Sequence, residues 1–239
     1  MRLCDATLPS PAENLALEEA WLDACEEDGH EEVLRFWEPA EHFVVVGYAN
    51  SVAREVNLEF CASRNIPTLR RCSGGGTVLQ GPGCLNYCLI LQIEEDGPLR
   101  TVQAANQHIM GRNREAIGAL LGKPVEVRGC TDLTIGTMKF SGNSQRRRKR
   151  HLIFHGSFLL HMDLRLIEDS LTMPSKEPDY RQKRSHTQFL TNLEIDARRV
   201  KDALMSAWQA TEPPDSLPEA RLRQLVESKY STPAWNNKF

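Results

Sequence analysis

Residues 70–78 read RRCSGGGTV and decide the interpretation of the fold, because three consecutive glycines follow two arginines and a serine. Glycine has no Cβ, so backbone N–H groups in such a turn can approach an anion closely. An arginine beside them can hold a phosphate or carboxylate through two hydrogen bonds. A flexible β-turn is the alternative, since glycine is common in turns. The stretch matches neither GxxxxGK[ST] nor GxGxxG, so neither of those nucleotide-binding loops is supported.

The flanks of this turn predict strands and helices in mixed order. Residues 66–93 alternate between extended segments and glycine punctuation, so a glycine turn joins two strands. Upstream, residues 14–24 have the spacing of an amphipathic helix that starts near Pro11. The runs VLRFWEP and HFVVVGY predict two strands paired across a proline-containing turn, and residues 54–65 return to helical spacing.

The second half of the chain continues this mixed pattern. An amphipathic helix over 101–121 ends at Gly122, a strand pair over 125–145 turns at Gly136, and residues 151–163 extend the sheet. We expect helices over 164–173, 197–209 and 219–229, and a surface loop over 174–195. The order is no βαβ alternation, so we predict an α+β fold with a mixed β-sheet and packed helices. Residues 1–239 should form one domain, with 210–239 as a C-terminal helical extension.

Composition narrows the class of protein. The 239 residues are 41% hydrophobic and 26% charged, which is typical of a folded globular chain. Seven cysteines in no pattern favour a reducing compartment. With neither a signal segment nor an apolar run of about 20 residues, a cytoplasmic location away from membranes is expected. The net charge of −3 attracts no nucleic acid. The basic run 146–150, RRRKR, is a solvated loop or a phosphate contact, and RNA binding would need interleaved aromatic residues.

A second group of polar residues lies in 132–146. Lys139 stands between strand residues directly before a Ser-Gly turn, from where it can reach a carboxylate, phosphate or carbonyl oxygen as a point charge. Most lysines are simply solvated, and His155 in FHGS would by itself be read as structural.

Three stretches together resemble the lipoate-protein ligase A family. RRCSGGGTV with the later GCLN, TDLTIGTMKFSGNSQR, and HGSFLL are similar to the family signatures RRxSGGGxVxHxxGxLN, NDLxxxGxKxSGxAxR and HHGTLL. NLALEEAWL resembles the family's first helix, FVVVGYANSVAREVN its second strand and loop, and STPAWNN its closing motif. Blocks in matching order are more specific than any one of them. The resemblance implies a biotin/lipoate protein ligase-like catalytic domain.

The resemblance also implies an activity. Members attach lipoate or octanoate, through an acyl-adenylate made with ATP and Mg, to a lysine of a lipoyl domain of a 2-oxoacid dehydrogenase or of the glycine cleavage H protein. Lys139 matches the family's central catalytic group, and no protein side chain is expected as a metal ligand. The positions that match the family's acyl-adenylate contacts are Arg71, Ser73, Gly74, Gly75, Gly76, Thr77, Val78, Gln80, Asp132, Ser141, Gly142, Arg146 and His155.

The sequence departs from the family pattern in four places. Gln80 replaces a histidine, Thr131 replaces an asparagine, and Cys72 occupies the variable position of RRxSGGG. The sequence also ends soon after WNN, so we expect no C-terminal accessory domain like that of the long ligases. Either a separate accessory subunit would then support adenylation, or the acyl group would arrive already activated.

Related enzymes define two rival activities. Octanoyltransferases use a cysteine nucleophile and a thioester donor, and Cys130 lies near Asp132 as a candidate. Their cysteine lies several residues further upstream, however, and their RRPTGGRAVLH form is absent, so SGGG favours the ligase branch. Biotin protein ligases carry a GRGRxGR loop that this sequence lacks, which disfavours biotin.

Overall fold

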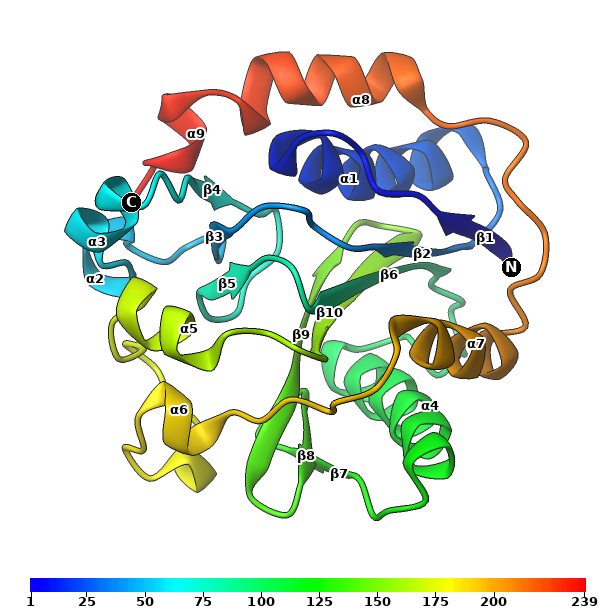
Figure 1. The fold of residues 1–239 in the computed structure, drawn as a ribbon. Helices are drawn as coiled ribbons and strands as arrows, with labels where there is room; N and C mark the ends of the chain where they lie inside the picture. The colour runs from blue at the N-terminus through cyan, green and yellow to red at the C-terminus, as the bar shows by residue number, and fades with distance from the viewer.

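Residues 1–239 are described by a computed structural model with two sheets and helices on both sides of the larger one (Figure 1). The strands are β1 (Arg2–Asp5), β2 (Val33–Trp37), β3 (Phe43–Val46), β4 (Thr68–Arg70), β5 (Val78–Gln80), β6 (Cys84–Gln92), β7 (Glu126–Arg128), β8 (Asp132–Ile135), β9 (Met138–Arg147) and β10 (His151–Leu159). The helices are α1 (Pro11–Asp28), α2 (Val52–Glu55), α3 (Leu58–Ser63), α4 (Val102–Leu121), α5 (Leu164–Ser170), α6 (His186–Phe189), α7 (Ala197–Trp208), α8 (Glu219–Leu225) and α9 (Pro233–Asn236). Two short turns complete the set, the 3-10 turn η1 (Asp179–Arg181) and the π-helical turn η2 (Val226–Tyr230).

The larger sheet has seven strands in the order β1-β2-β6-β10-β9-β8-β7, and the smaller sheet has three in the order β4-β3-β5. Strands β1 and β2 run parallel, as do β3 and β4, and all other neighbouring pairs are antiparallel. A mixed sheet with packed helices confirms the predicted α+β fold.

Alternate residues of the central strands supply two separate cores. Leu89 and Leu91 of β6 pack with α4 and α7 in the largest core cluster, whereas Cys88 and Ile90 pack with α1 on the opposite face. This alternation follows from the two-residue repeat of a strand. The α1 face is the one that matters for function, because it also carries the glycine turn described below.

Helix α1 is more deeply buried than the amphipathic pattern predicts. It starts at a capping box between Ser10 and Glu13 and ends at Gly29, whose φ is +71°. The sheet lies under it, and α8 and η2 cross above it, so even Glu18 and Glu19 are buried (Figure 1). A polar side chain on this helix therefore points into the protein, where it needs a partner.

The predicted pairing of β2 with β3 is wrong. Strand β2 pairs with β1 and β6 in the large sheet, while β3 pairs with β4 and β5 in the small one. The connection 38–42 contains Pro39 and turns the chain out of the large sheet, and Trp37 and Phe43 stack across the corner with ring centroids 6.2 Å apart. A short tight hairpin would have needed a two-residue turn of the Asn-Gly kind, which is absent here.

Other predicted elements are confirmed with changes of detail. The helix over 101–121 and its end at Gly122 are confirmed, with Thr101 as the N-cap. The helix predicted over 54–65 is two short helices, because Val56 is extended and bridges to Leu171, after which Asn57 caps α3. The stretch 174–195 is mostly irregular but contains η1 and α6.

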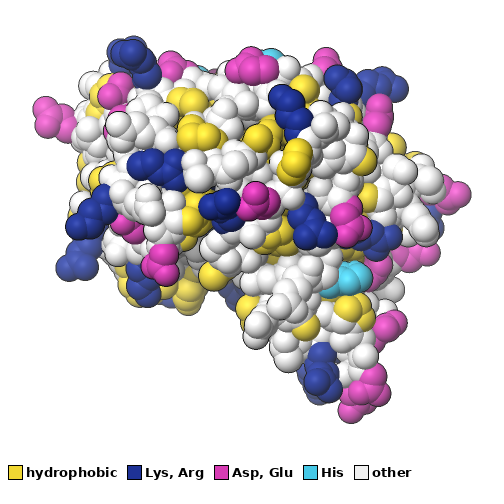
Figure 2. All heavy atoms as spheres, turned by 90° about the horizontal axis from the view of Figure 1, so that it is seen from below, with side chains coloured by type: hydrophobic (Ala, Val, Ile, Leu, Met, Phe, Trp, Pro, Cys, Tyr) yellow, Lys and Arg dark blue, Asp and Glu magenta, His cyan; other side chains and the backbone are white.

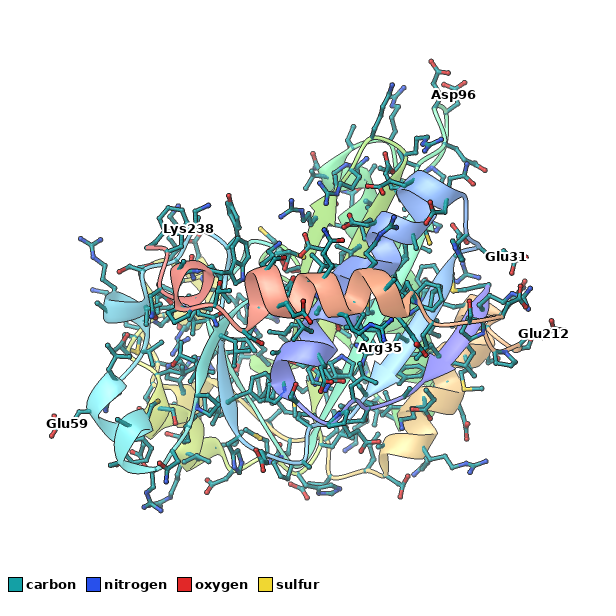
Figure 3. The ribbon with its side chains drawn as sticks, turned by 90° about the horizontal axis from the view of Figure 1, so that it is seen from above. Glu31, Arg35, Glu59, Asp96, Glu212 and Lys238 are labelled. Carbon is teal, nitrogen blue, oxygen red and sulfur yellow. The ribbon has the colours of Figure 1, made fainter.

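The last thirty residues cross over α1 and return to the glycine turn (Figures 1 and 3). Arg70 is the anchor: its guanidinium donates to the carbonyls of Trp235 and Asn236, and its own carbonyl accepts from the Trp235 indole at 2.8 Å. In Figure 3 the labelled Lys238 lies at the edge of the molecule, while Arg35 lies in its interior under α1 and α8. None of the helices has the length and apolar character needed to cross a membrane.

Candidate active site

Residues 71–77, here called the glycine loop, connect β4 to β5 and rest on the α1 face of the large sheet. Ser144 of β9 donates to the carbonyl of Gly74 at 2.8 Å, and His155 of β10 contacts the Ser73 hydroxyl. Gly75 has a φ of +85°, and a Cβ on Gly47 would lie 2.1 Å from the Gly75 carbonyl oxygen. Glycine is therefore required at both positions for the loop to close against β3.

The carbonyl groups of the glycine loop point into the protein. Arg71 is the main donor, reaching the carbonyls of Gly74 and Gly76 at 2.6 and 2.7 Å. The other carbonyl contacts of this run are from Tyr48 N to Ser73 O, from Asn50 Nδ2 to Gly75 O and from Arg146 Nη1 to Cys72 O.

The N–H groups of residues 72–77 donate to no acceptor within the protein. Gly74, Gly75 and Gly76 are exposed, so their N–H groups are open to water or a ligand. Backbone whose carbonyls are paired while exposed N–H groups have no acceptor is suited to binding an anion. The geometry thus supports anion binding here more directly than a triple glycine alone.

Arg71 has a different role from the one suggested by its place in the sequence. All three of its guanidinium nitrogens donate to the protein, to the Ser73 hydroxyl and to the carbonyls of Val45, Gly74 and Gly76. Burial lowers its pKa to about 10, which leaves it charged at neutral pH. Arg71 therefore shapes the loop from behind rather than gripping an anion directly.

Lys139 occupies the other end of the same face and is held by a polar pair. Its Nζ lies 2.8 Å from Asp132 Oδ1, and the Tyr180 hydroxyl donates to Asp132 Oδ2 at 2.7 Å. Burial and the Asp132 carboxylate raise the pKa of Tyr180, so this phenol stays a donor. The Lys139 side chain remains 23% exposed and is therefore accessible to a ligand.

Strand β9 connects Lys139 to the glycine loop. A Cβ on Gly142 would lie 2.9 Å from Lys139 Nζ, so the ammonium group rests directly over this glycine. Ser144 and Arg146 follow on the same face and contact the loop at Gly74 and Cys72. Gly142 under the ammonium group and Ser144 at the glycine loop are two residues apart on β9, so Lys139 and the loop lie beside neighbouring positions of one strand face.

Behind the loop lies a buried chain of polar side chains that starts on α1. His155 Nε2 is 2.5 Å from the Ser73 hydroxyl oxygen, and His155 Nδ1 is 2.5 Å from Glu18 Oε2. The other Glu18 oxygen accepts from the Trp37 indole at 2.8 Å. Sequence reasoning selected Ser73 and His155 but missed Glu18, because an acidic residue on a helix looks solvated when the overlying helix is unknown.

The basic run 146–150 is largely paired. Arg147 donates to the carbonyls of Leu99 and Arg100, and Arg148 pairs with Asp23 of α1 at 2.7 Å. The backbone N–H groups of Lys149 and Arg150 donate to Glu26. The run is thus fastened to the acidic side of α1, and only the Lys149 side chain has neither an ion pair nor a hydrogen bond.

The remaining candidates have mainly local roles. Gln80 is buried and accepts from Cys84 at 3.1 Å, while Val78 lies in the small sheet and the Thr77 hydroxyl has no partner. Ser141 accepts from Asn143, an amide that sequence reasoning missed. Asn143 also donates to the carbonyl of Thr131 at 2.7 Å, which holds the turn that precedes Asp132.

A surface hollow of about 520 Å³ lies beside this site rather than on it. It is lined by the end of α4, the β8–β9 turn and residues 191–195, and it adjoins Lys139 through Met138. Figure 2 shows that acidic and basic side chains are interspersed with apolar ones over the face seen from below. No three His, Cys, Asp or Glu side chains converge as metal ligands.

Comparison with known proteins identifies the family of this chain. The family profile described as the lipoyl protein ligase A/B catalytic domain matches residues 10–209. The chain belongs to this family. It is therefore a member of the enzyme family of lipoate-protein ligases and octanoyltransferases, as the three signature stretches predicted.

Individual relatives fall in both branches of the family. Lipoate-protein ligase A subunit 1 of Thermoplasma acidophilum is 26% identical over 87% of this chain and 85% of its own length. Octanoyltransferase LipM of Brevibacillus brevis is also 26% identical, over 95% of each chain. The bi-partite lipoate protein ligase of T. acidophilum, whose structural study includes its E2 lipoyl domain, superposes with a TM-score of 0.84 at 23% identity, covering 99% and 95% of the two chains.

Cys130 is the candidate nucleophile for the thioester route of the transferases. It is the one exposed cysteine, and the other six are buried. It lies in the turn next to Asp132, but no side chain hydrogen-bonds to its sulfur and no histidine or arginine pairs with it. Its position permits access to a substrate, whereas a nucleophilic cysteine usually has an adjacent base or cation to activate it.

Proposed function

We propose that this chain is a lipoate-protein ligase-type acyltransferase that attaches lipoate or octanoate, through an acyl-adenylate, to a lysine of a lipoyl carrier domain. The observation that carries the proposal is the exposed run Gly74–Gly76, whose N–H groups have no acceptor in the protein, together with the accessible Lys139, whose ammonium group rests over Gly142. An acyl-adenylate has the matching shape, with a phosphate next to a carbonyl group.

In the proposed transfer step, the glycine loop and Lys139 act on different parts of the acyl-adenylate. The loop N–H groups hold the phosphate, and Lys139 Nζ lies against the acyl carbonyl oxygen. The acceptor amine attacks the carbonyl carbon, charge develops on that oxygen beside Lys139, and the bond to the phosphate oxygen breaks as AMP leaves. Asp132 and Tyr180 keep the ammonium group in position. No covalent enzyme intermediate is needed.

The same site would bind the small molecules from which the acyl-adenylate is made. One related ligase has been crystallised with ATP, and the T. acidophilum protein with lipoic acid. For this chain we propose ATP as the source of the adenylate. A Mg²⁺ ion would be held by phosphate oxygens and water, because Mg²⁺ keeps several waters and this protein lacks a cluster of metal-ligating side chains. Its contribution when bound would be to offset phosphate charge.

The acceptor partner is proposed to be a lipoyl domain of a 2-oxoacid dehydrogenase or the glycine cleavage H protein. The basic run would dock an acidic surface of that domain, and Lys149 supplies its one unpaired charge. Lys149→Glu should raise the KM for the acceptor while leaving binding of lipoyl-adenylate unchanged. An unaltered acceptor KM in this variant would remove the basic run from the interface.

Cysteine-dependent octanoyl transfer is the second candidate, supported by the exposure of Cys130 and by the likeness to LipM. In that mechanism the Cys130 thiolate would take the acyl group from a thioester, release the donor thiol, and pass the acyl group to the acceptor amine. The cysteine would then be essential, and Lys139 would still hold the acyl oxygen.

One experiment separates these activities. A purified lipoyl domain is incubated in parallel with lipoate plus Mg-ATP, with preformed lipoyl-adenylate, or with octanoyl carrier protein, and its mass is measured intact. The proposal predicts transfer from the adenylate by wild type and by Cys130→Ala alike. Transfer from the carrier protein alone, lost in Cys130→Ala, would establish the thioester route. Transfer from lipoate plus Mg-ATP by this chain alone would show that no accessory subunit is needed.

A further inference from the structure

Two carboxylate–histidine pairs join helix α1 to strand β10, and they differ in what lies beyond them. Glu26 meets His151 at 3.3 Å near the surface, and Glu18 meets His155 at 2.5 Å in the interior. The spacing of eight helix residues and four strand residues is about 12–13 Å in both elements, so the pairs are equivalent in register. Only His155 continues to a further partner, the Ser73 hydroxyl of the glycine loop.

The hydrogen-bond donors around Glu18 determine where the protons lie. The Trp37 indole can only donate, and it occupies Glu18 Oε1 at 2.8 Å. Burial alone would raise the pKa of Glu18, but attraction to His155 and Arg35 and the hydrogen bonds from His155 and Trp37 bring it below its ordinary value. Glu18 is therefore a carboxylate, which can only accept, so the hydrogen on the His155 ring sits on Nδ1.

The Ser73 hydroxyl is oriented by the hydrogen-bonding roles of its two neighbours, His155 and Arg71. When the His155 ring carries a single hydrogen, on Nδ1, its Nε2 is an acceptor, so the Ser73 O–H donates to it. The Ser73 oxygen is then free to accept from Arg71 Nε at 3.1 Å. Arg71 in turn holds the carbonyls of Gly74 and Gly76 inward. A continuous series of hydrogen bonds, each with an assigned donor and acceptor, therefore links Glu18 to the glycine carbonyls.

We propose that Glu18 is a positioning residue of this site: it fixes the Nδ1-protonated tautomer of His155, and through Ser73 and Arg71 it keeps the N–H groups of the glycine loop turned outward. The proposal deepens the acyl-adenylate function given above and rests on it for its effect on activity. Its structural half, the tautomer, stands independently of any substrate.

Other charged or titratable groups around this chain do not offer a competing partner. From β2, buried Arg35 donates to the carbonyls of Ala6 and Asn14 and to the Asn14 side chain, and reaches Glu18 only through space. From β6, Cys88 lies opposite His155, and burial raises its pKa well above the usual range. From the loop, burial raises the pKa of Cys72 to about 12, and from β9, Ser144 lies opposite His155 and donates to Gly74.

Glu18→Gln is the informative substitution, because Trp37 dictates how the new amide must point. The amide oxygen has to accept from the indole, which turns the NH2 group toward His155 Nδ1. Nδ1 must then accept, the hydrogen moves to Nε2, and the Ser73 O–H loses its acceptor. Glu26→Gln is the matched control, since it alters the equivalent pair on the same two elements without reaching the loop.

The test combines ¹⁵N NMR of histidine-labelled protein with transfer kinetics. Seven histidines are present, and His155→Gln identifies the signal of His155. We expect the Nδ1–H tautomer in wild type and in Glu26→Gln, and the Nε2–H tautomer in Glu18→Gln. Glu18→Gln should also weaken binding of lipoyl-adenylate at least tenfold, whereas Glu26→Gln should bind it like wild type.

The possible outcomes separate the tautomer of His155, the positioning role of Glu18 and the proposed function. An Nε2–H tautomer in wild type would overturn the proposal even if Glu18→Gln failed to fold. Equal adenylate binding by the two glutamine variants would overturn the positioning role while leaving the proposed function intact. If wild type transferred no acyl group from any donor but showed the expected tautomers, the function would fail and the assignment of protons would stand.

Discussion

The glycine loop and the Lys139 end of β9 lie on one face of one strand, yet they are held in opposite ways. The loop is built from behind by buried side chains, with its carbonyls paired and its N–H groups left over. Lys139 is held at its tip by one partly exposed carboxylate, and its own side chain is 23% exposed. The difference separates a buried support for the loop backbone from a partly exposed charge, and the proposed acyl-adenylate would place its phosphate at the first and its carbonyl group at the second.

Removing the charge of Lys139 should have the largest effect on acyl transfer. Lys139→Ala is expected to lower acyl transfer by about a thousandfold, the upper range for loss of one oxyanion donor. The side chain is partly exposed, so the melting temperature should hardly change. Intact mass of the lipoyl domain measures the transfer. Near-normal transfer by a folded Lys139→Ala protein would contradict the proposed role of Lys139 in the transfer step.

Weakening the support of the glycine loop should affect the stability of the protein as well as the binding of the adenylate. Arg71→Lys keeps the charge but loses the planar fork, so at least one of the carbonyls of Gly74 and Gly76 is left without its donor. We expect a loss of about 1–3 kcal/mol in the free energy of unfolding, the cost of an unsatisfied buried group. Urea denaturation measures it. Weaker adenylate binding should accompany the loss, and unchanged binding would show that the loop keeps its shape without Arg71.

Acid should affect the two carboxylate–histidine pairs unequally. The pKa of Glu18 is lowered on folding, as is that of Glu26, so each favours the folded state above the unfolded value of about 4.3 and loses that contribution as the pH falls through its lower folded value. Glu18 is the more deeply buried of the two. Urea midpoints between about pH 6 and 3 should therefore decline less steeply in Glu18→Gln than in wild type. A larger flattening in Glu26→Gln would reverse our ranking.

Cysteine labelling gives the smallest expected change and tests the geometry alone. Burial raises the pKa of Cys25, Cys72 and Cys84 to about 12, and Cys130 is the exposed thiol. Iodoacetamide at pH 8 should add one group per folded chain, and none to Cys130→Ala. Two or more adducts on the native protein would mean that the core around the loop opens more readily than the buried contacts imply.

Sequence alone determined the fold class and the family, and it selected candidate polar groups that the structure brings together on one face of the large sheet. Strong local signals were sufficient there: Gly122 and Thr101 bound a helix, and the SGGG, KFSG and HGS stretches keep their order and spacing. Local signals failed where the partner is distant. The runs that became β2 and β3 are equally apolar, and only their pairing with β6 and β4 separates them into two sheets.

Tertiary structure decided which of these polar groups are paired inside the protein and which stay exposed. Arg71 looked like an anion ligand and instead holds the loop carbonyls, while Glu18 looked like a surface acid and instead holds His155. The physical reason is burial: α8 and η2 cover α1, and a covered polar group must find a partner within the protein. Sequence names the residue types at a site, but their hydrogen-bond partners are fixed only when distant elements pack together.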